Sequence, residues 1–271
     1  MKLAWREVSV GLIVPTLLVL LWHVVTAQGW VNPQALPSPA AVARKWVEYL
    51  LPLQPYAGEG SRLAWAFSGE LIHDALGSMY RVVLGFAIGA GLALPLGLAM
   101  GASAHAYRLF NVLVQIIRPV PPIAYIPLSM LWFGLGNPPA VFLISLGAFF
   151  PVLINTIAGV RQVDGIYLRA ARNLGASGAT MFLRVILPAA VPSILAGVRI
   201  GIGTAFIVVI VAEMVAVNNG LGFRISEARE YFWSDKIIAG MITIGMLGLA
   251  IDVGMDRLNN HLLRWHRGLE S

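Results

Sequence analysis

The sequence predicts an all-α integral membrane protein. Of its 271 residues, 58% are hydrophobic and only 12% are charged, whereas soluble domains average about 25% charged residues. Six segments come close to the roughly 20 mostly apolar residues that a helix needs to cross a bilayer. They are residues 8–27, 82–101, 109–133, 139–158, 193–214 and 237–255. The net charge of +6 is scattered between apolar runs rather than gathered on one face, so no nucleic-acid partner is indicated.

The first span, 8–27, is longer than a typical signal-peptide core, and we expect it to be retained. A proline-rich connector follows, in which Ser38 and Pro39 predict a capped amphipathic helix with proline at its first position. We expect this helix to lie along the outer membrane face, with the Trp46 and Tyr49 rings at the interface with lipid. The later loop 215–235 combines turn chemistry with mixed charges, and either outer loop could meet a partner.

The even number of spans places both termini on one side of the membrane. With that side cytoplasmic, lysine and arginine outnumber the acidic residues in the inner segments, whereas the outer segments are nearly balanced. The positive-inside rule therefore predicts a multi-pass protein of the cell (inner) membrane with cytoplasmic termini. The expected divisions are 1–78 for the first helix and its extracytoplasmic connector, 79–262 for a five-helix core, and 263–271 for a cytoplasmic tail.

The polar segment 164–188 lies between two apolar spans and is predicted to be helical and cytoplasmic. Ala170, Ala171 and Gly175 would give it a face of low relief, Gly175 suits a sharp turn, and Pro188 would end the segment before the next span. The alternative is an arginine-bearing surface helix without a partner.

The third span contains Pro119, Pro121 and Pro122, which remove backbone donors and forbid a regular helix at membrane depth. Such a break is tolerated where protein or a water-filled cavity satisfies the backbone, so this span could line a pore or be a kinked, packed helix. Arg118 is the best candidate to contact an anion. A structural ion pair or a backbone clamp is the equal alternative for Arg118.

Two further ionisable residues lie in the spans. Arg199 is expected to extend toward the cytoplasmic surface, and Glu213 to pair with a base in the following loop or to face the exit of a pathway. The glycines of spans two and five predict close helix packing. The histidines show no metal-ligand spacing, and the chain has no cysteine, phosphate loop or nucleophile elbow, so neither a metal site nor an enzyme is predicted.

Two motifs resemble a known family. Arg169-Ala170-Ala171, three residues, Gly175, nine residues and Val185-Ile186-Leu187-Pro188 resemble the EAA signature of ABC importer permeases. Arg169 stands where the signature has Glu, and Val185 where it has Ile. The segment 117–122 (IRPVPP), the later WFGLG and FFPVLINTIAGV are similar to permeases of the sulfonate, taurine, nitrate and bicarbonate branch.

The resemblance implies a type I ABC importer permease whose 164–188 segment is the coupling helix. ATPase coupling would involve the following residues: Arg169, Ala170, Ala171, Arg172, Gly175, Ala176, Leu187 and Pro188. The chain itself would carry no cofactor, because ATP and Mg²⁺ would bind to the partner ATPase, which is expected in two copies. A solute-binding protein and a second permease copy, giving a homodimer, are the other expected partners beside membrane lipid.

The resemblance implies aliphatic sulfonate or taurine as the first expected cargo, and nitrate or bicarbonate as the second. The substrate pathway is expected to include Arg118, Pro119, Pro121, Pro122 and Glu213. A stand-alone secondary transporter or channel is the rival class, and it would need an intramembrane relay of acidic or histidine side chains. The chain offers only Glu213 and Asp252 near span ends for such a relay.

Overall fold

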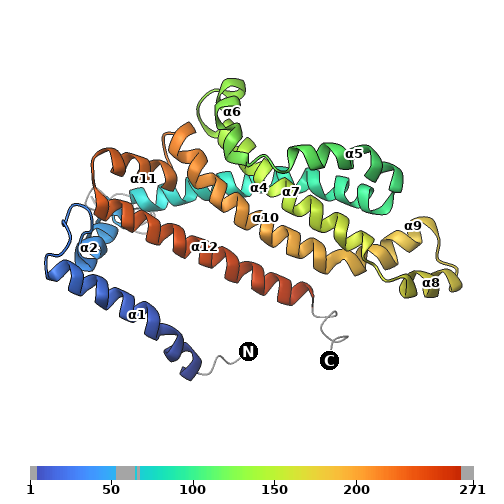
Figure 1. Ribbon diagram of the computed structural model, residues 1–271, viewed down its shortest axis with the longest axis horizontal. Helices are drawn as coiled ribbons and strands as arrows, with labels where there is room; N and C mark the ends of the chain where they lie inside the picture. The colour runs from blue at the N-terminus through green and yellow to red at the C-terminus, as the bar shows by residue number, and fades with distance from the viewer. Residues whose placement is uncertain (1–4, 53–64, 66–67, 264–271) are drawn as a thin grey trace. The chain divides into compact units, whose positions relative to one another are not determined.

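The computed structural model describes residues 5–52, 65 and 68–263, and the regular elements in this part of the chain are all helical (Figure 1). The predicted all-α class is confirmed. The predicted tail 263–271 lies outside the described residues except for Leu263. The chain forms two compact units. The first comprises Met1–Ala75 and Arg224–Gly245, and the second comprises Leu76–Phe223 and Met246–Ser271.

The first unit contains α1 (Trp5–Ala27) and α2 (Pro39–Leu50), most of α11 (Leu221–Glu230) and the beginning of α12 (Ser234–Leu262). The predicted cap of α2 is confirmed, because Ser38 Oγ accepts the backbone N–H of Ala41 at 3.2 Å and Pro39 opens the helix. The hydrogen bond from Ala41 to Ser38 and the proline at the first helical position fix the start of α2.

The predicted position of the Tyr49 ring at the lipid interface is wrong. Tyr49 is buried and its hydroxyl donates to Asp74 Oδ2 at 2.7 Å, while Arg224 Nε donates to the same oxygen at 2.7 Å. Burial, with the hydrogen bond to Asp74, raises the pKa of the Tyr49 hydroxyl. The buried carboxylate of Asp74 must be hydrogen-bonded, and the Tyr49 hydroxyl points inward because it is one of the donors to that carboxylate.

The second unit is built around α7 (Asn137–Arg161) and α10 (Leu187–Ala216), which pack along each other. It also contains nearly all of α4 (Glu70–Ala102), all of α5 (Ala104–Ile117), α6 (Ile126–Phe133), α8 (Gly165–Asn173) and α9 (Gly178–Met181), and the end of α12. A Cβ added to Gly89 of α4 would lie 2.3 Å from the carbonyl oxygen of Ser145 in α7. The predicted close helix packing through glycine is therefore confirmed at this contact.

Five helices among the described residues are long and apolar enough to span a membrane. The predicted third span, 109–133, is not one continuous helix. The chain forms α5, then a 3₁₀ turn at Pro122–Tyr125 and α6, with a bend of 80° between the two parts. The proline break is therefore confirmed, and a sixth span exists only if this bent pair is counted as one.

Pro188 does not end the 164–188 segment, which corrects the prediction. Helical structure continues from Gly178 to Ala216 through a π-helix, η2, at Phe182–Ile186. The N–H of Leu187 donates to the carbonyl of Phe182, five residues back. The wider π-turn lies where the ring of Pro188 would crowd the carbonyl four residues before it, so proline is accommodated in the first turn of α10.

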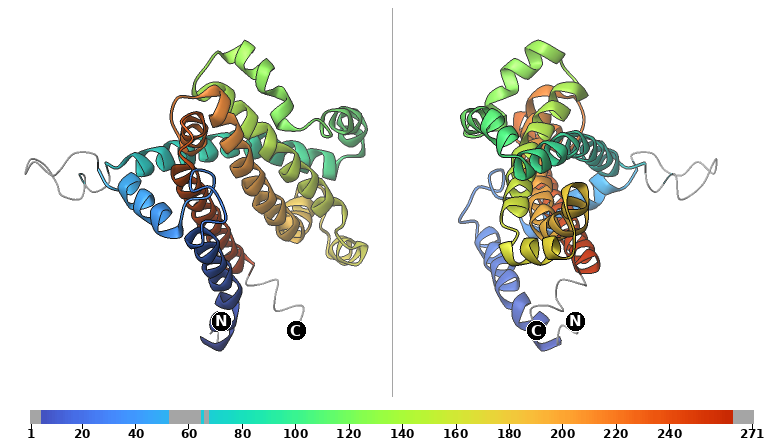
Figure 2. Two further views of the ribbon diagram at one scale, coloured as in Figure 1. Left: turned by 60° about the vertical axis from the view of Figure 1, so that its left-hand side comes forward. Right: turned by 90° about the vertical axis from the view of Figure 1, so that its right-hand side faces the viewer.

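The second unit has two clearly different ends. All three views place α6 at one end of α7 and α10, and α8 with α9 at the other (Figures 1 and 2). The N–H of Gly136, before α7, donates to the carbonyl of Ala216 at the end of α10 at 2.7 Å. The pairing ties the α6–α7 turn to the end of α10 that lies away from α8.

Candidate functional site

The helix α8 and the turn after it are shaped by local hydrogen bonds. Asp164 Oδ1 accepts the N–H of Ile166 at 2.8 Å and caps the start of the helix. At its end, the N–H of Ala176 donates to Ala171 O and that of Gly175 to Arg172 O, both at 2.9 Å. This pattern is a Schellman motif, which requires a left-handed residue after the cap. Gly175 has φ +84°, so the predicted sharp turn is confirmed.

The same helix presents apolar side chains to its surroundings. Leu174 is 89% exposed, Ile166 60% and Tyr167 59%. With Ala170, which is also exposed, these residues follow helical spacing and share one face. Reasoning from the sequence found the small residues but missed this apolar face, although the spacing of residues 166, 170 and 174 could have revealed it. A large exposed apolar face indicates an interaction surface.

The expected coupling residues do not all lie together. Arg169, Ala170, Ala171 and Arg172 belong to α8, and Gly175 and Ala176 form its closing turn. Leu187 and Pro188 instead form the first turn of α10. The signature thus covers both a surface helix and the start of the next span.

A pocket of about 340 Å³ lies where the third span breaks. Arg118 and Val120 come from the break after α5, Pro122 and Ile123 come from the 3₁₀ turn, and the remaining lining side chains come from α7 and α10. We call it the Arg118 pocket. It is lined by Arg118, Val120, Pro122, Ile123, Leu146, Gly147, Phe150, Pro151, Thr204, Ile207 and Val208.

The pocket lies near the middle of the membrane-spanning helices. Gly147 and Pro151 are ten or more residues from either end of α7, which corresponds to about 15 Å of helix and to half the thickness of a hydrocarbon core of about 30 Å. Pro151 cannot donate to the carbonyl of Gly147. Thr204 Oγ1 lies 2.9 Å from that oxygen and 2.9 Å from the carbonyl oxygen of Gly201. The threonine hydroxyl therefore satisfies the backbone inside the membrane.

Arg118 is exposed, and among the described residues no hydrogen bond or ion pair engages its guanidinium. The structure therefore gives no support to a structural ion pair or backbone clamp. Pro122 shares the pocket with Arg118, whereas Pro119 and Pro121 lie in the break without lining it. A positive charge beside an apolar pocket at mid-membrane depth can attract an anion.

Glu213 lies in a different place, inside a buried ion pair. Its side chain is 0% exposed and that of Arg81 is 3% exposed, with Arg81 Nη1 at 2.6 Å from Glu213 Oε1. The other carboxylate oxygen accepts Ser78 Oγ at 2.8 Å and the N–H of Gly222 at 3.0 Å. The partner base is thus in α4 and not in the following loop, which corrects the expectation. Arg81 lies beside the start of the predicted second span, and no local motif marks it as the partner of Glu213.

The loop after α10 closes over this ion pair. Arg81 also donates to Asn137 Oδ1 at 2.7 Å, to Asn219 O at 3.2 Å and to Asn219 Oδ1. Gly220 has φ +109°, and a Cβ on it would lie 2.6 Å from Cδ of Glu213. Only glycine fits so close to the carboxylate. Glu213 is therefore enclosed and is not brought to the Arg118 pocket.

Arg199 has two acidic partners on α12, and its extension toward the cytoplasmic surface stays a prediction. Its Nη2 lies 2.7 Å from Asp252 Oδ1 and its Nη1 2.5 Å from Asp256 Oδ1. The two carboxylates are one turn apart on α12, so both meet the guanidinium of α10. Asp252 is therefore paired with a base, which argues against its use in a proton relay.

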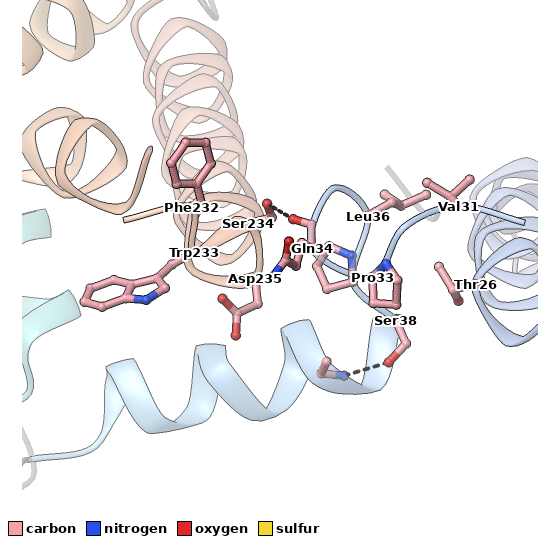
Figure 3. A pocket seen from close by; sticks show the side chains of 12 residues that line it. Thr26, Val31, Pro33, Gln34, Leu36, Ser38, Phe232, Trp233, Ser234 and Asp235 are labelled. Carbon is pink, nitrogen blue, oxygen red and sulfur yellow. Dashed lines mark hydrogen bonds between the residues drawn. The ribbon is translucent and has the colours of Figure 1, made fainter. Parts of the chain in front are cut away.

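A second hollow, of about 520 Å³, lies in the first unit (Figure 3). Segment 26–41 and the turn between α11 and α12 form it, and Ser234 Oγ donates to the carbonyl of Gln34 across it. Phe232 in this turn is 82% exposed with φ +57°, a backbone conformation that costs roughly 1–2 kcal/mol for a residue with a side chain. The rings of its two sequence neighbours, Tyr231 and Trp233, stack on each other with their centroids 4.8 Å apart.

No group of three or more histidine, cysteine or acidic side chains that could hold a metal occurs in the described part of the chain. The long apolar helices, the exposed helix between two of them and the cation at mid-membrane depth define a multi-pass membrane transport subunit. The chain belongs to the family of inner membrane components of binding-protein-dependent transport systems, whose family model matches residues 91–268.

Known relatives support this assignment over almost the whole chain. The putative aliphatic sulfonates transport permease protein SsuC of Bacillus subtilis is 35% identical over 96% of this chain and 89% of its own. The taurine transport system permease protein TauC of Escherichia coli is 35% identical over 98% and 94%. The inward-facing structure of the MetNI methionine ABC transporter has a chain with a TM-score of 0.62 at 20% identity, over 70% of this chain and 95% of that chain.

The resemblance to ABC importer permeases is thereby confirmed, and the structural likeness confirms the fold. The chain is a membrane permease subunit and not an enzyme, because ATP hydrolysis in this family belongs to a separate ATPase subunit.

Proposed function

We propose that the chain is the permease of an ATP-driven importer for aliphatic sulfonate or taurine. The relatives SsuC and TauC, each 35% identical over nearly the full length, support this cargo. The single observation that carries the proposal is the unpaired Arg118 guanidinium at the pocket in the broken third span. A guanidinium offers a planar, permanently charged donor to an oxyanion. Nitrate or bicarbonate is the alternative cargo.

The pathway in this proposal runs past Arg118, Pro119, Pro121 and Pro122. The prolines open the backbone at the depth of the pocket, and Arg118 attracts the anion there. Glu213 is left out of the pathway, because its carboxylate is enclosed by three donors, from Ser78, Arg81 and Gly222, and carries a charge of the wrong sign for an anion.

The coupling proposal assigns α8 and its closing turn to the ATPase contact. Leu174 and Tyr167 would enter an apolar cleft of the ATPase together with the small residue Ala170 between them, while Arg169 and Arg172 contact its rim. The burial of exposed apolar side chains supplies the affinity of such a contact. Two ATPase subunits would bind ATP and Mg²⁺ and serve two permease copies as a homodimer.

The topology proposal places both termini and α8 in the cytoplasm. The excess of basic residues in the inner segments supports this orientation. The end of the second unit that holds the Arg81–Glu213 ion pair then faces outward, opposite α8 (Figure 2). A solute-binding protein would deliver the substrate at the outer face, where the aromatic turn around Phe232 offers a contact surface.

Uptake into proteoliposomes tests the cargo and the role of Arg118 together. Arg118→Gln should reduce the uptake of taurine or an alkanesulfonate about tenfold or more, because the charge is lost with little change in volume, and should leave assembly and basal ATP hydrolysis intact. Arg118→Lys should fall between, since an ammonium keeps the charge but loses the planar fork. Normal uptake by the Gln variant would show that Arg118 is not part of the pathway. If the wild-type protein took up nitrate or bicarbonate but no sulfonate, the proposed cargo would be wrong.

A further inference from the structure

The Arg118 pocket contains one charge and is otherwise almost entirely hydrocarbon. Val120, Ile123, Leu146, Ile207 and Val208 provide aliphatic walls, with the Phe150 ring beside them. The one hydroxyl, that of Thr204, has its proton engaged by backbone carbonyls. Arg118 is therefore the only side chain in the lining with donors left for a ligand.

The volume and the lining fit a ligand with two parts. A pocket of about 340 Å³ is within the range that holds small organic ligands. A small inorganic oxyanion held at Arg118 would leave the apolar walls facing water. No carboxylate lines the pocket, so it offers no counter-charge to an ammonium group on a tail, and of the two proposed cargoes it fits an alkanesulfonate better than taurine, whose tail ends in an ammonium group. An anion that continues into a hydrocarbon chain satisfies both the guanidinium and the walls.

We propose that the Arg118 pocket makes the permease itself selective for the length of an anion's hydrocarbon tail, with Ile207 as a specificity-determining wall residue. This inference rests on the proposed function, because it concerns the same pocket in the same transport cycle. Ile207 is 65% exposed, so it presents its side chain to the ligand without holding the fold together. Each methylene that leaves water contributes about 0.8 kcal/mol, or roughly fourfold in affinity.

Cysteine protection in the assembled permease–ATPase complex in lipid nanodiscs tests the proposal directly. The native chain contains no cysteine, so a single introduced thiol reports on its own position. Ile207→Cys lies in the pocket, whereas Ile200→Cys is the matched control, since Ile200 is 51% exposed on the same helix and does not line the pocket. The rate of reaction with a water-soluble thiol reagent is measured with methane-, propane- and hexanesulfonate.

The sulfonates should slow the labelling of Ile207→Cys, and the half-protecting concentration should fall with every added methylene, by up to about fourfold each. Ile200→Cys should not be protected. Hexylammonium, which has the same tail as hexanesulfonate but the opposite charge, should not protect, and Arg118→Gln should raise the half-protecting concentration of every sulfonate at least tenfold.

Protection that does not depend on chain length would overturn the proposal, as would equal protection of both cysteines, protection by hexylammonium or an unreactive Ile207→Cys. Failure of the proposed function has a separate signature, because it would appear as a wild-type complex with no ATP-dependent uptake of any organic anion. Labelling needs neither the binding protein nor ATP hydrolysis, so the two failures can be told apart.

Discussion

The buried Arg81–Glu213 ion pair gives the sharpest prediction about stability. Glu213→Gln keeps the shape of the side chain but leaves the Arg81 charge without its counter-ion at a site where both side chains are at most 3% exposed. Removing one partner of such a pair costs about 3–5 kcal/mol, because the remaining charge stays buried. Arg81→Met should cost a similar amount, since it leaves Glu213 with only the Ser78 and Gly222 donors.

The double variant Arg81→Met with Glu213→Leu should recover much of this loss. Replacing both charges by apolar groups removes the desolvation penalty together with the attraction, although the groups of Asn137 and Asn219 that accept from Arg81 lose their donor. The expected coupling energy from the double-mutant cycle is about 2 kcal/mol or more.

Denaturant unfolding of the full-length chain in mixed micelles measures these differences. Glu48→Gln is the control, because it removes an exposed ion pair with Lys45 and should change the free energy of unfolding by no more than about 0.5 kcal/mol. Single variants that each cost less than about 1 kcal/mol, or costs that simply add in the double variant, would refute the reasoning.

Three further predictions concern the segment around α8. Ser177→Cys should be labelled by a membrane-impermeant thiol reagent only after the cells are opened, and labelling from outside intact cells would reverse the proposed topology. Leu174→Asp should lower co-purification of the ATPase and uptake at least tenfold without affecting folding, because Leu174 is 89% exposed. The control Trp30→Asp, at a 72% exposed position in the connector after α1, should leave co-purification unchanged. Gly175→Leu should insert normally at a cost of roughly 1–2 kcal/mol for φ +84°, and full substrate-stimulated ATP hydrolysis in this variant would exclude the turn from coupling.

Local chemistry explains what could be read from the sequence. The Ser38 cap, the left-handed turn at Gly175 and the break at residues 119–122 each depend on residues within one or two turns of each other. Propensities and missing donors act at this range whatever the rest of the fold does. The span lengths follow for a similar reason, because the thickness of the bilayer sets them.

Long-range pairing explains what could not be read. Arg81 and Glu213 are 132 residues apart, and Tyr49 reaches Asp74 from a helix that looks amphipathic by itself. Nothing local distinguishes a buried partner from an exposed one in these cases. The prediction that Pro188 ends a helical segment was wrong for a local reason. A π-turn at residues 182–186 accommodates the proline ring, so the helix continues, and single-residue rules do not anticipate such a turn.

The helix α10 connects the features on which the proposed transport cycle depends. Its first turn, at Leu187, follows the π-turn beside α8 and α9, and Thr204 of the Arg118 pocket lies about 26 Å further along at 1.5 Å per residue. Glu213 lies about 14 Å beyond that, where the buried ion pair holds the helix to α4. In the proposed cycle, a displacement of α8 by the ATPase would therefore reach α10 through the π-turn, while the buried ion pair holds the other end of α10 to α4. The Arg118 pocket lies between the π-turn and the ion pair, and Thr204, Ile207 and Val208 of α10 line it. A bend of α10 between these two points would therefore move the pocket walls around a substrate.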